Sequence, residues 1–276
     1  MKSLAAIDVV DRFAPLRTHL AALLTDLSET DWARPTAAAQ WSVKDAAAHL
    51  LGGDIGILSR SRDGFHPPGT VIATHSELID LVNSLNREWV LAARRMSPLL
   101  LRELLAFTGP QVEAYFSSLD PCAMGGPVTW AGPAPAPVWL DIAREFTERW
   151  HHQQQIRDAT GHPPLYDPYF LSPVLDAFVR ALPHSFRHTS ARDGTVLRFE
   201  ISGTAGNVWF LVRIGQTWEL ALESEVEPAA DVVLPQDTAW RMFTKGIDSE
   251  RAGALAVIRG DPALVPSIFK TVAVIG

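Results

Sequence analysis

The chain has 276 residues, of which 47% are hydrophobic and 20% charged, a balance that excludes an intrinsically disordered protein and favours two domains or one large one. The formal net charge of −7 gives no attraction for nucleic acid or an anionic membrane surface, so neither is expected as a partner. Cys122 is the only cysteine, and no segment has the pattern of a signal peptide or a membrane span, so we expect a cytoplasmic protein.

In the first part of the chain, apolar residues recur with the period of an α-helix. Ser42 is the predicted N-cap of the second helix, with Asp45 in its first turn, and Ser76 is the predicted cap of the third. Gly109 and Pro110 are expected to divide the next helical segment into two pieces. The predicted helices cover residues 5–27, 41–64, 75–97, 98–109, 110–119 and 138–160, and a Pro- and Gly-rich surface loop covers 120–137.

After Pro163 and Pro164 the pattern changes to short β-rich runs separated by Gly-containing turns. The sequence therefore predicts an N-terminal helical bundle in residues 1–165 and a small α+β domain with an antiparallel sheet in residues 166–276. Strands are predicted at 195–203, 207–215, 217–224, 231–235 and 254–260, and helices at 168–182, 237–246 and 261–272.

The stretch "TERWHHQQQIRDATG" in the helix at 138–160 contains the first candidate metal ligands. Glu148 and His152 are four residues apart, so their side chains lie one helical turn apart beside an apolar stripe. Polar pairs with this spacing are common on helices, so the pair alone is weak evidence for a metal. The predicted solvent-facing side consists of Thr147, His151, Gln154 and Asp158, which makes His152 the candidate ligand and His151 a surface residue.

His49 is a third candidate, because it lies in a run of small and apolar residues where an unpaired imidazole is costly. Gly52 and Gly53 follow it and are expected to leave bare space for an open ligand position. Asp45, four residues earlier, could accept a hydrogen bond from the second ring nitrogen and fix the tautomer. The alternatives are a core histidine bonded to a backbone carbonyl, and an aspartate that only stabilises the first turn.

The segments "WSVKDAAAHL" and "REFTERWHHQQQIRDATG" resemble the DinB-like superfamily, and within it the mycothiol-dependent maleylpyruvate isomerase family. The resemblance implies a DinB-like four-helix bundle in which His49, Glu148 and His152 bind one divalent metal. It also implies a sterol-carrier-like α+β domain in residues 166–276. The sequence departs from the family at Gln155, where an acidic residue is common.

Two histidines and one glutamate leave a coordination position open, as in catalytic metal sites. Zinc suits these ligands best, although nickel, cobalt or iron would also fit. The resemblance implies a metal-bound thiolate, from a low-molecular-weight thiol such as mycothiol, that attacks an electrophilic small molecule, in an isomerase or S-transferase reaction. Two alternatives remain open, a metal-dependent hydrolase that uses bound hydroxide and a non-enzymatic small-molecule or lipid-binding protein.

No catalytic or thiol-binding residue is assigned from the sequence. An anionic diacid substrate would need a cation besides the metal, and arginine suits carboxylates because its guanidinium binds them in a bidentate manner. Cys122 lies in the Gly/Pro loop and is not expected to be catalytic. The candidate arginines of the second domain, each with the alternative of an ordinary surface residue, are Arg213, Arg241, Arg251 and Arg259.

Overall fold

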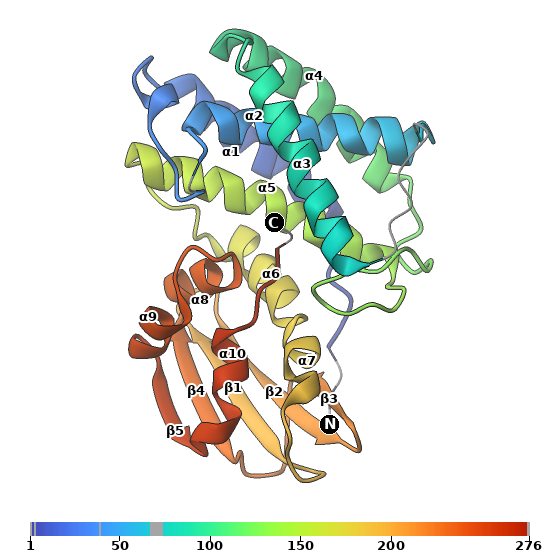
Figure 1. The fold of residues 1–276 in the computed structure, drawn as a ribbon, viewed down its shortest axis with the longest axis vertical. Helices are drawn as coiled ribbons and strands as arrows, with labels where there is room; N and C mark the ends of the chain where they lie inside the picture. The colour runs from blue at the N-terminus through green and yellow to red at the C-terminus, as the bar shows by residue number, and fades with distance from the viewer. Residues whose placement is uncertain (1, 3, 39, 67–73, 275–276) are drawn as a thin grey trace. The chain divides into compact units, whose positions relative to one another are not determined.

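The computed structural model describes residues 2, 4–38, 40–66 and 74–274 (Figure 1). These residues form two compact units. The helical unit comprises Val9–Asp120 and Glu148–Leu165, and the sheet unit comprises Pro121–Thr147, Tyr166–Val274 and the start of the chain up to Asp8. The limits 1–165 and 166–276 stay a prediction. Among the described residues, no helix has the length and apolar character needed to cross a bilayer.

The helical unit contains four long helices and, from Glu148 onward, part of a fifth, and the predicted helical bundle is confirmed (Figure 1). Leu24, Leu51 and Leu101, from three of these helices, lie in one buried core. The helices are α1 (Phe13–Asp26), α2 (Val43–Gly56), α3 (His75–Ala93), α4 (Pro98–Ser117) and α5 (Val138–Thr160), and α2 continues into a π-helical turn at Ile57–Arg62. Short 3-10 helices lie at Val10–Arg12 and Asp31–Ala33.

Local sequence determines where these helices begin. Ser42 and Asp45 form the predicted capping box of α2, in which each side chain accepts a hydrogen bond from the backbone of the other. The cap of α3 was predicted wrongly. Thr74 and Glu77 form its capping box, and Ser76 is the second residue of the helix. The two residues that satisfy the free N–H groups are therefore the pair with the Thr-x-x-Glu spacing.

The first helix is shorter than predicted, since α1 begins at Phe13 rather than at residue 5. In contrast, α5 has the predicted bounds, Val138–Thr160. Gly161 follows α5 with a φ of 73°, a left-handed conformation that glycine adopts readily at a helix C-terminus.

Pro110 does not divide the fourth helical segment, because α4 runs without interruption from Pro98 to Ser117. The reason is tertiary packing. Leu101 and Leu105 lie before the proline, Val112 and Phe116 lie after it, and all four are buried on a continuous stripe of the helix. Burial of that stripe outweighs the hydrogen bond that a proline removes from the helix interior.

The sheet unit contains five strands in the order β3-β2-β1-β4-β5, and the predicted small α+β domain is confirmed. The predicted antiparallel pairing is wrong at one position, because β1 and β4 are parallel. After β1 the chain forms β2 and β3 on one side, and the loop at 222–229 then returns it to the other side of β1. The strands are β1 (Val196–Ser202), β2 (Asn207–Ile214), β3 (Thr217–Ala221), β4 (Ala230–Pro235) and β5 (Val257–Gly260).

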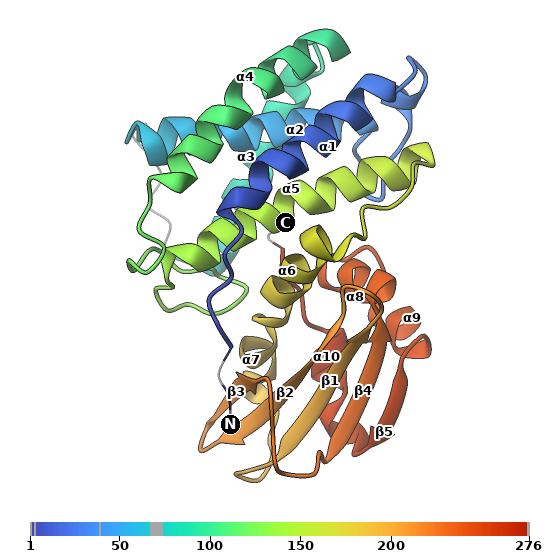
Figure 2. The same cartoon turned by 180° about the vertical axis from the view of Figure 1, so that it is seen from behind.

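Helices cover one face of this sheet, as both views show (Figures 1 and 2). Phe199, Leu211 and Val232 are buried on that face, in neighbouring strands. At one edge, the four residues of β5 are all exposed. Besides the first part of α5, the helices of the unit are α6 (Pro168–Val179), α7 (Leu182–Ser185), α8 (Gln236–Phe243), α9 (Ser249–Ala254) and α10 (Pro266–Phe269). Neither α9 nor α7 beyond its first residue was predicted.

Candidate metal centre

The structure brings His49, Glu148 and His152 together inside the helical unit. His49 is on α2, and Glu148 and His152 are one turn apart on α5. One potential ligand atom from each residue lies within 4.8 Å of the others. His152 is buried, whereas His49 and Glu148 are partly exposed. These three residues could therefore hold one metal ion in a site that is not fully buried.

His152 is oriented by a neighbour on its own helix. Its Nδ1 lies 2.9 Å from Oε1 of Gln155, and its Nε2 lies 3.4 Å from Oε2 of Glu148. Because an amide oxygen only accepts hydrogen bonds, Nδ1 is the donor in the contact with Gln155, and Nε2 lies on the side of Glu148. The ring of His49 meets this ring edge to face, with centroids 4.5 Å apart.

Trp41 is a site residue that the sequence analysis did not select. Its indole lies 4.7 Å from the ring of His49 and 5.9 Å from the ring of His152, measured between centroids. Trp41 directly precedes the N-cap of α2, and its carbonyl accepts a hydrogen bond from the N–H of Thr36. The sequence feature that could have indicated this role is its position as the first residue of "WSVKDAAAHL", the segment that contains His49.

The glycines and the aspartate near His49 differ from expectation. A Cβ on Gly52 would lie 2.5 Å from the indole of Trp89. The space beside this glycine is therefore filled by Trp89 and is not open for a metal ligand. Nε1 of Trp89 donates to the carbonyl of Ala48 at 2.7 Å. Of the two glycines, only Gly53 has open space beside it. Asp45 accepts hydrogen bonds from Arg94 and from the backbone of Ser42, as in the alternative of a first-turn acid.

The predicted solvent side of α5 was largely wrong. Thr147, His151 and Gln154 are buried, and Asp158 alone of the predicted set is exposed. His151 is only 5% exposed. Burial lowers the pKa of His151 well below its ordinary value of 6.5, and repulsion by the positive forms of His152 and His49 lowers it further.

Three consecutive buried glutamines explain how a polar segment enters the core. Gln153 donates to the carbonyl of Leu16 on α1, and Gln154 accepts from the N–H of Leu165. Gln155 bonds to His152. Each amide is therefore paired with a different group, which offsets the desolvation that would otherwise disfavour polar side chains in the core.

The candidate arginines of the sheet unit have different surroundings. Arg213 is buried, with its guanidinium 5.8 Å from the ring of Trp218, which contradicts a surface position. Arg241 pairs with Asp237 and lies over Trp240. Arg251 and Arg259 are exposed, and Arg259 lies 3.7 Å from Asp231. Cys122 is also exposed, in its loop.

Comparison with known proteins gives one family and two similar structures. The family model described as mycothiol maleylpyruvate isomerase N-terminal domain matches residues 13–157, more than half of the chain. The crystal structure of a histidine-to-alanine mutant of the mycothiol-dependent maleylpyruvate isomerase has a TM-score of 0.56 at 10% identity, over 94% of this chain and 95% of that chain. A second crystal structure, of the mycothiol-dependent maleylpyruvate isomerase, has a TM-score of 0.54 at 11% identity, over 88% and 91%.

At these identities the structural similarity establishes a shared fold. A search of curated proteins gives no match. The family match covers α1 to α4 and α5 as far as Arg157, and thus includes all three candidate ligands. The chain therefore belongs to the family defined by the mycothiol maleylpyruvate isomerase N-terminal domain.

Proposed function

We propose that this protein is a metal-dependent enzyme that uses a low-molecular-weight thiol, such as mycothiol, to isomerise an electrophilic small molecule or to form a thioether with it. The observation that carries the proposal is the convergence of His49, Glu148 and His152 in a chain of this family. Maleylpyruvate, on which the two similar solved proteins act, is the first substrate to test.

The donor set fits a divalent cation. Two imidazoles and one carboxylate are ligands that zinc favours, and three protein ligands leave a further position for water or substrate. Glu148 supplies negative charge, and the Nδ1 contact of His152 with Gln155 holds the ring in the tautomer that a metal ligand needs. When bound, the cation supplies Lewis acidity that stabilises a thiol as its thiolate.

The other residues around the site position the reacting groups and limit access of water. Trp41 lies against both histidine rings and forms an apolar wall. Gln155 is neutral where the family commonly has an acid, so His152 keeps its orientation but is less polarised than it would be beside a carboxylate. Partial exposure of His49 and Glu148 leaves one side of the site open to small molecules.

The nucleophile is expected to come from outside the chain. Cys122 is the only cysteine of the sequence, and it lies in an exposed loop of the sheet unit, outside the helical unit that holds the three candidate ligands. An external thiol that binds at the open side of the site supplies the sulfur without help from this residue. We also propose the cytoplasm as the location, in keeping with the use of a small reduced thiol.

Elemental analysis of the purified protein and an activity assay with and without added mycothiol test the proposal. We expect about one divalent metal per chain and turnover only with the thiol. Cys122→Ser should retain activity, since its sulfur takes no part. Turnover by the metal-loaded protein without any thiol would contradict the proposal and favour the hydrolase alternative, and a protein without metal affinity would favour a binding protein.

A further inference from the structure

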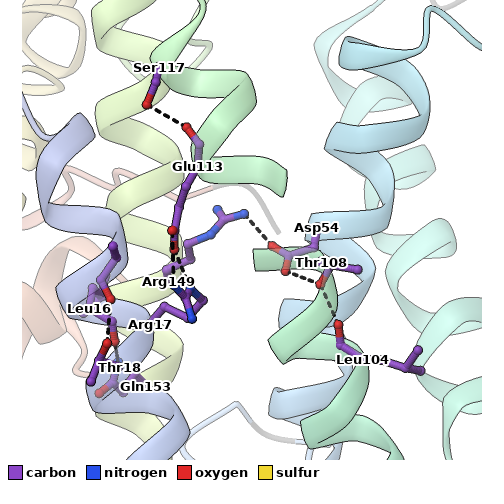
Figure 3. Close-up of polar contacts among 11 residues, drawn as sticks. Leu16, Arg17, Thr18, Asp54, Leu104, Thr108, Glu113, Ser117, Arg149 and Gln153 are labelled. Carbon is purple, nitrogen blue, oxygen red and sulfur yellow. Dashed lines mark hydrogen bonds and ion pairs between the residues drawn. The ribbon is translucent and has the colours of Figure 1, made fainter. Parts of the chain in front are cut away.

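The helical unit contains two pairs of charged side chains (Figure 3), and the four residues line one small cavity. Asp54 pairs with Arg149, and Arg17 pairs with Glu113. The cavity has a volume of about 40 Å³, and its remaining walls are largely apolar. Charged groups in such surroundings are stable only when they are paired, so loss of one partner would leave the other charge without compensation.

The pair of Asp54 and Arg149 is held from several directions. Nη2 of Arg149 lies 2.8 Å from Oδ1 of Asp54, and the hydroxyl of Thr108 donates to Oδ2 at 2.7 Å. The side chains of Asp54 and Arg149 are only 7% and 17% exposed. The guanidinium of Arg149 also lies over the rings of Phe13 and Phe116, 5.6 and 5.9 Å from their centroids. The pair therefore has a defined geometry and little freedom to move.

This pair directly joins the two helices that carry the candidate ligands. Asp54 is on α2, five residues after His49, which corresponds to about 7.5 Å along the helix axis. Arg149 is on α5, next to Glu148 in sequence and three residues before His152. In contrast, Arg17 and Glu113 join α1 to α4, neither of which carries a ligand.

We propose that Asp54 and Arg149 are positioning residues, which fix α2 against α5 and thereby hold His49 at coordinating distance from Glu148 and His152. The inference rests on the proposed function, because it requires that these three residues bind a metal. Ligands that are already in place bind a metal without the entropic cost of ordering two helices, so the pair raises metal affinity although neither residue touches the metal.

Four variants test this inference at the same cavity. Asp54→Asn and Arg149→Met break the pair between the ligand helices, and Arg17→Met and Glu113→Gln break the matched pair between α1 and α4. Zinc affinity is measured by competition with a chromophoric chelator, and folding by circular dichroism. We expect the first two variants to bind zinc about tenfold more weakly than the unmodified protein. The two control variants should remain within about twofold of it.

The paired design separates positioning from a simple effect of charge. Removal of the positive charge of Arg149 should strengthen cation binding if charge alone mattered, whereas removal of the negative charge of Asp54 should weaken it. Weaker binding in both variants supports positioning. Opposite changes, or equal losses in all four variants, would overturn it.

Arg149→Lys provides a milder test if Arg149→Met does not fold. It keeps the charge and loses the planar group above Phe13 and Phe116, so we expect a smaller loss of zinc affinity in the same direction, and an unchanged affinity would contradict the inference. An unmodified protein that binds no zinc or other divalent metal would overturn the proposed function and this inference together. Unchanged affinity in Asp54→Asn and Arg149→Met would overturn the inference alone.

Discussion

His152 and Gln155 form a hydrogen bond within one turn of α5, with 2.9 Å between Nδ1 and Oε1. The contact leaves Nε2 of His152 directed toward Glu148. An amide thus lies next to the candidate ligand histidine, at the position where the family resemblance implies a carboxylate. It can orient the ring, but it adds no negative charge to it.

Replacement of Gln155 tests this contact. Gln155→Leu should weaken zinc binding by about 10- to 100-fold, because Nδ1 loses its partner and the ring its orientation. Gln155→Glu should bind zinc at least as tightly as the unmodified protein, since a carboxylate accepts the same hydrogen bond and raises the basicity of the ligand. Chelator competition measures both. Equal affinities in all three proteins would show that the contact has no part in metal binding.

The two adjacent histidines should respond differently to substitution. His152→Ala removes one of the three candidate ligands, so the protein should lose most of its metal. His151→Ala keeps the three ligands and should retain the metal, but it leaves a hole in the core and should lower the free energy of unfolding by about 2 kcal/mol. Elemental analysis and chemical denaturation measure the two effects. Metal loss of equal size in both variants would mean that His151 is also a ligand.

The two glycines after His49 form a matched pair for a packing test. Gly52→Ala places a methyl group 2.5 Å from the indole of Trp89, so it should destabilise the protein by about 1–3 kcal/mol despite the better helix propensity of alanine. Gly53→Ala meets no atom within 4 Å and should stabilise α2 by about 0.5–1 kcal/mol. Thermal unfolding gives the sign of each change, and stabilisation by both would contradict the packing of Trp89.

Acid should weaken the attachment of α2 to α3. Burial alone would raise the pKa of Asp45, but hydrogen bonds from Arg94 and Ser42 outweigh it and lower the pKa below the ordinary value of 3.8. The ionised carboxylate therefore stabilises the folded state above pH 3.8, and this contribution is lost as the pH falls through the lower folded value.

Asp45→Asn should reduce stability by about 1 kcal/mol at pH 7, a modest effect because Arg94 is screened by solvent. The difference from the unmodified protein should shrink as the pH falls below 3.8 and through the lowered folded pKa, because the carboxyl then becomes protonated in both states. Urea denaturation at a series of pH values measures it. A difference of the same size at every pH of the series would assign the effect to packing rather than charge.

Periodicity and spacing predicted the two helices that carry the candidate ligands, but the shared site came from the family resemblance. The interval from Glu148 to His152 and the small residues around His49 made each residue a candidate, the resemblance implied one common site, and the structure brings the three side chains together. The bounds of α5 were also predicted, because Gly161 is a strong signal for a helix end. The spacing of Glu148 and His152 and the end of α5 depend on local geometry, which one helix determines by itself.

Contacts between distant segments could not be predicted in this way. The burial of His151 depends on the elements that surround α5. The periodicity of one helix predicts only that its polar side faces solvent. The role of Gly52 depends on Trp89, which is on another helix. The parallel pairing of β1 with β4 depends on the path of the chain after β3. The approach of Trp41 to both histidines likewise requires the fold.

The short edge strand β5 has a consequence for self-association. Val257 and Ile258 are 52% and 41% exposed, and an edge strand with exposed apolar side chains can act as a template for other chains. However, β5 has only four residues, Gly260 turns the backbone with a φ of 81°, and Pro262 lacks an N–H two residues later. A foreign strand could form only a few hydrogen bonds there. The rim of the sheet can therefore remain apolar with little tendency to nucleate aggregates.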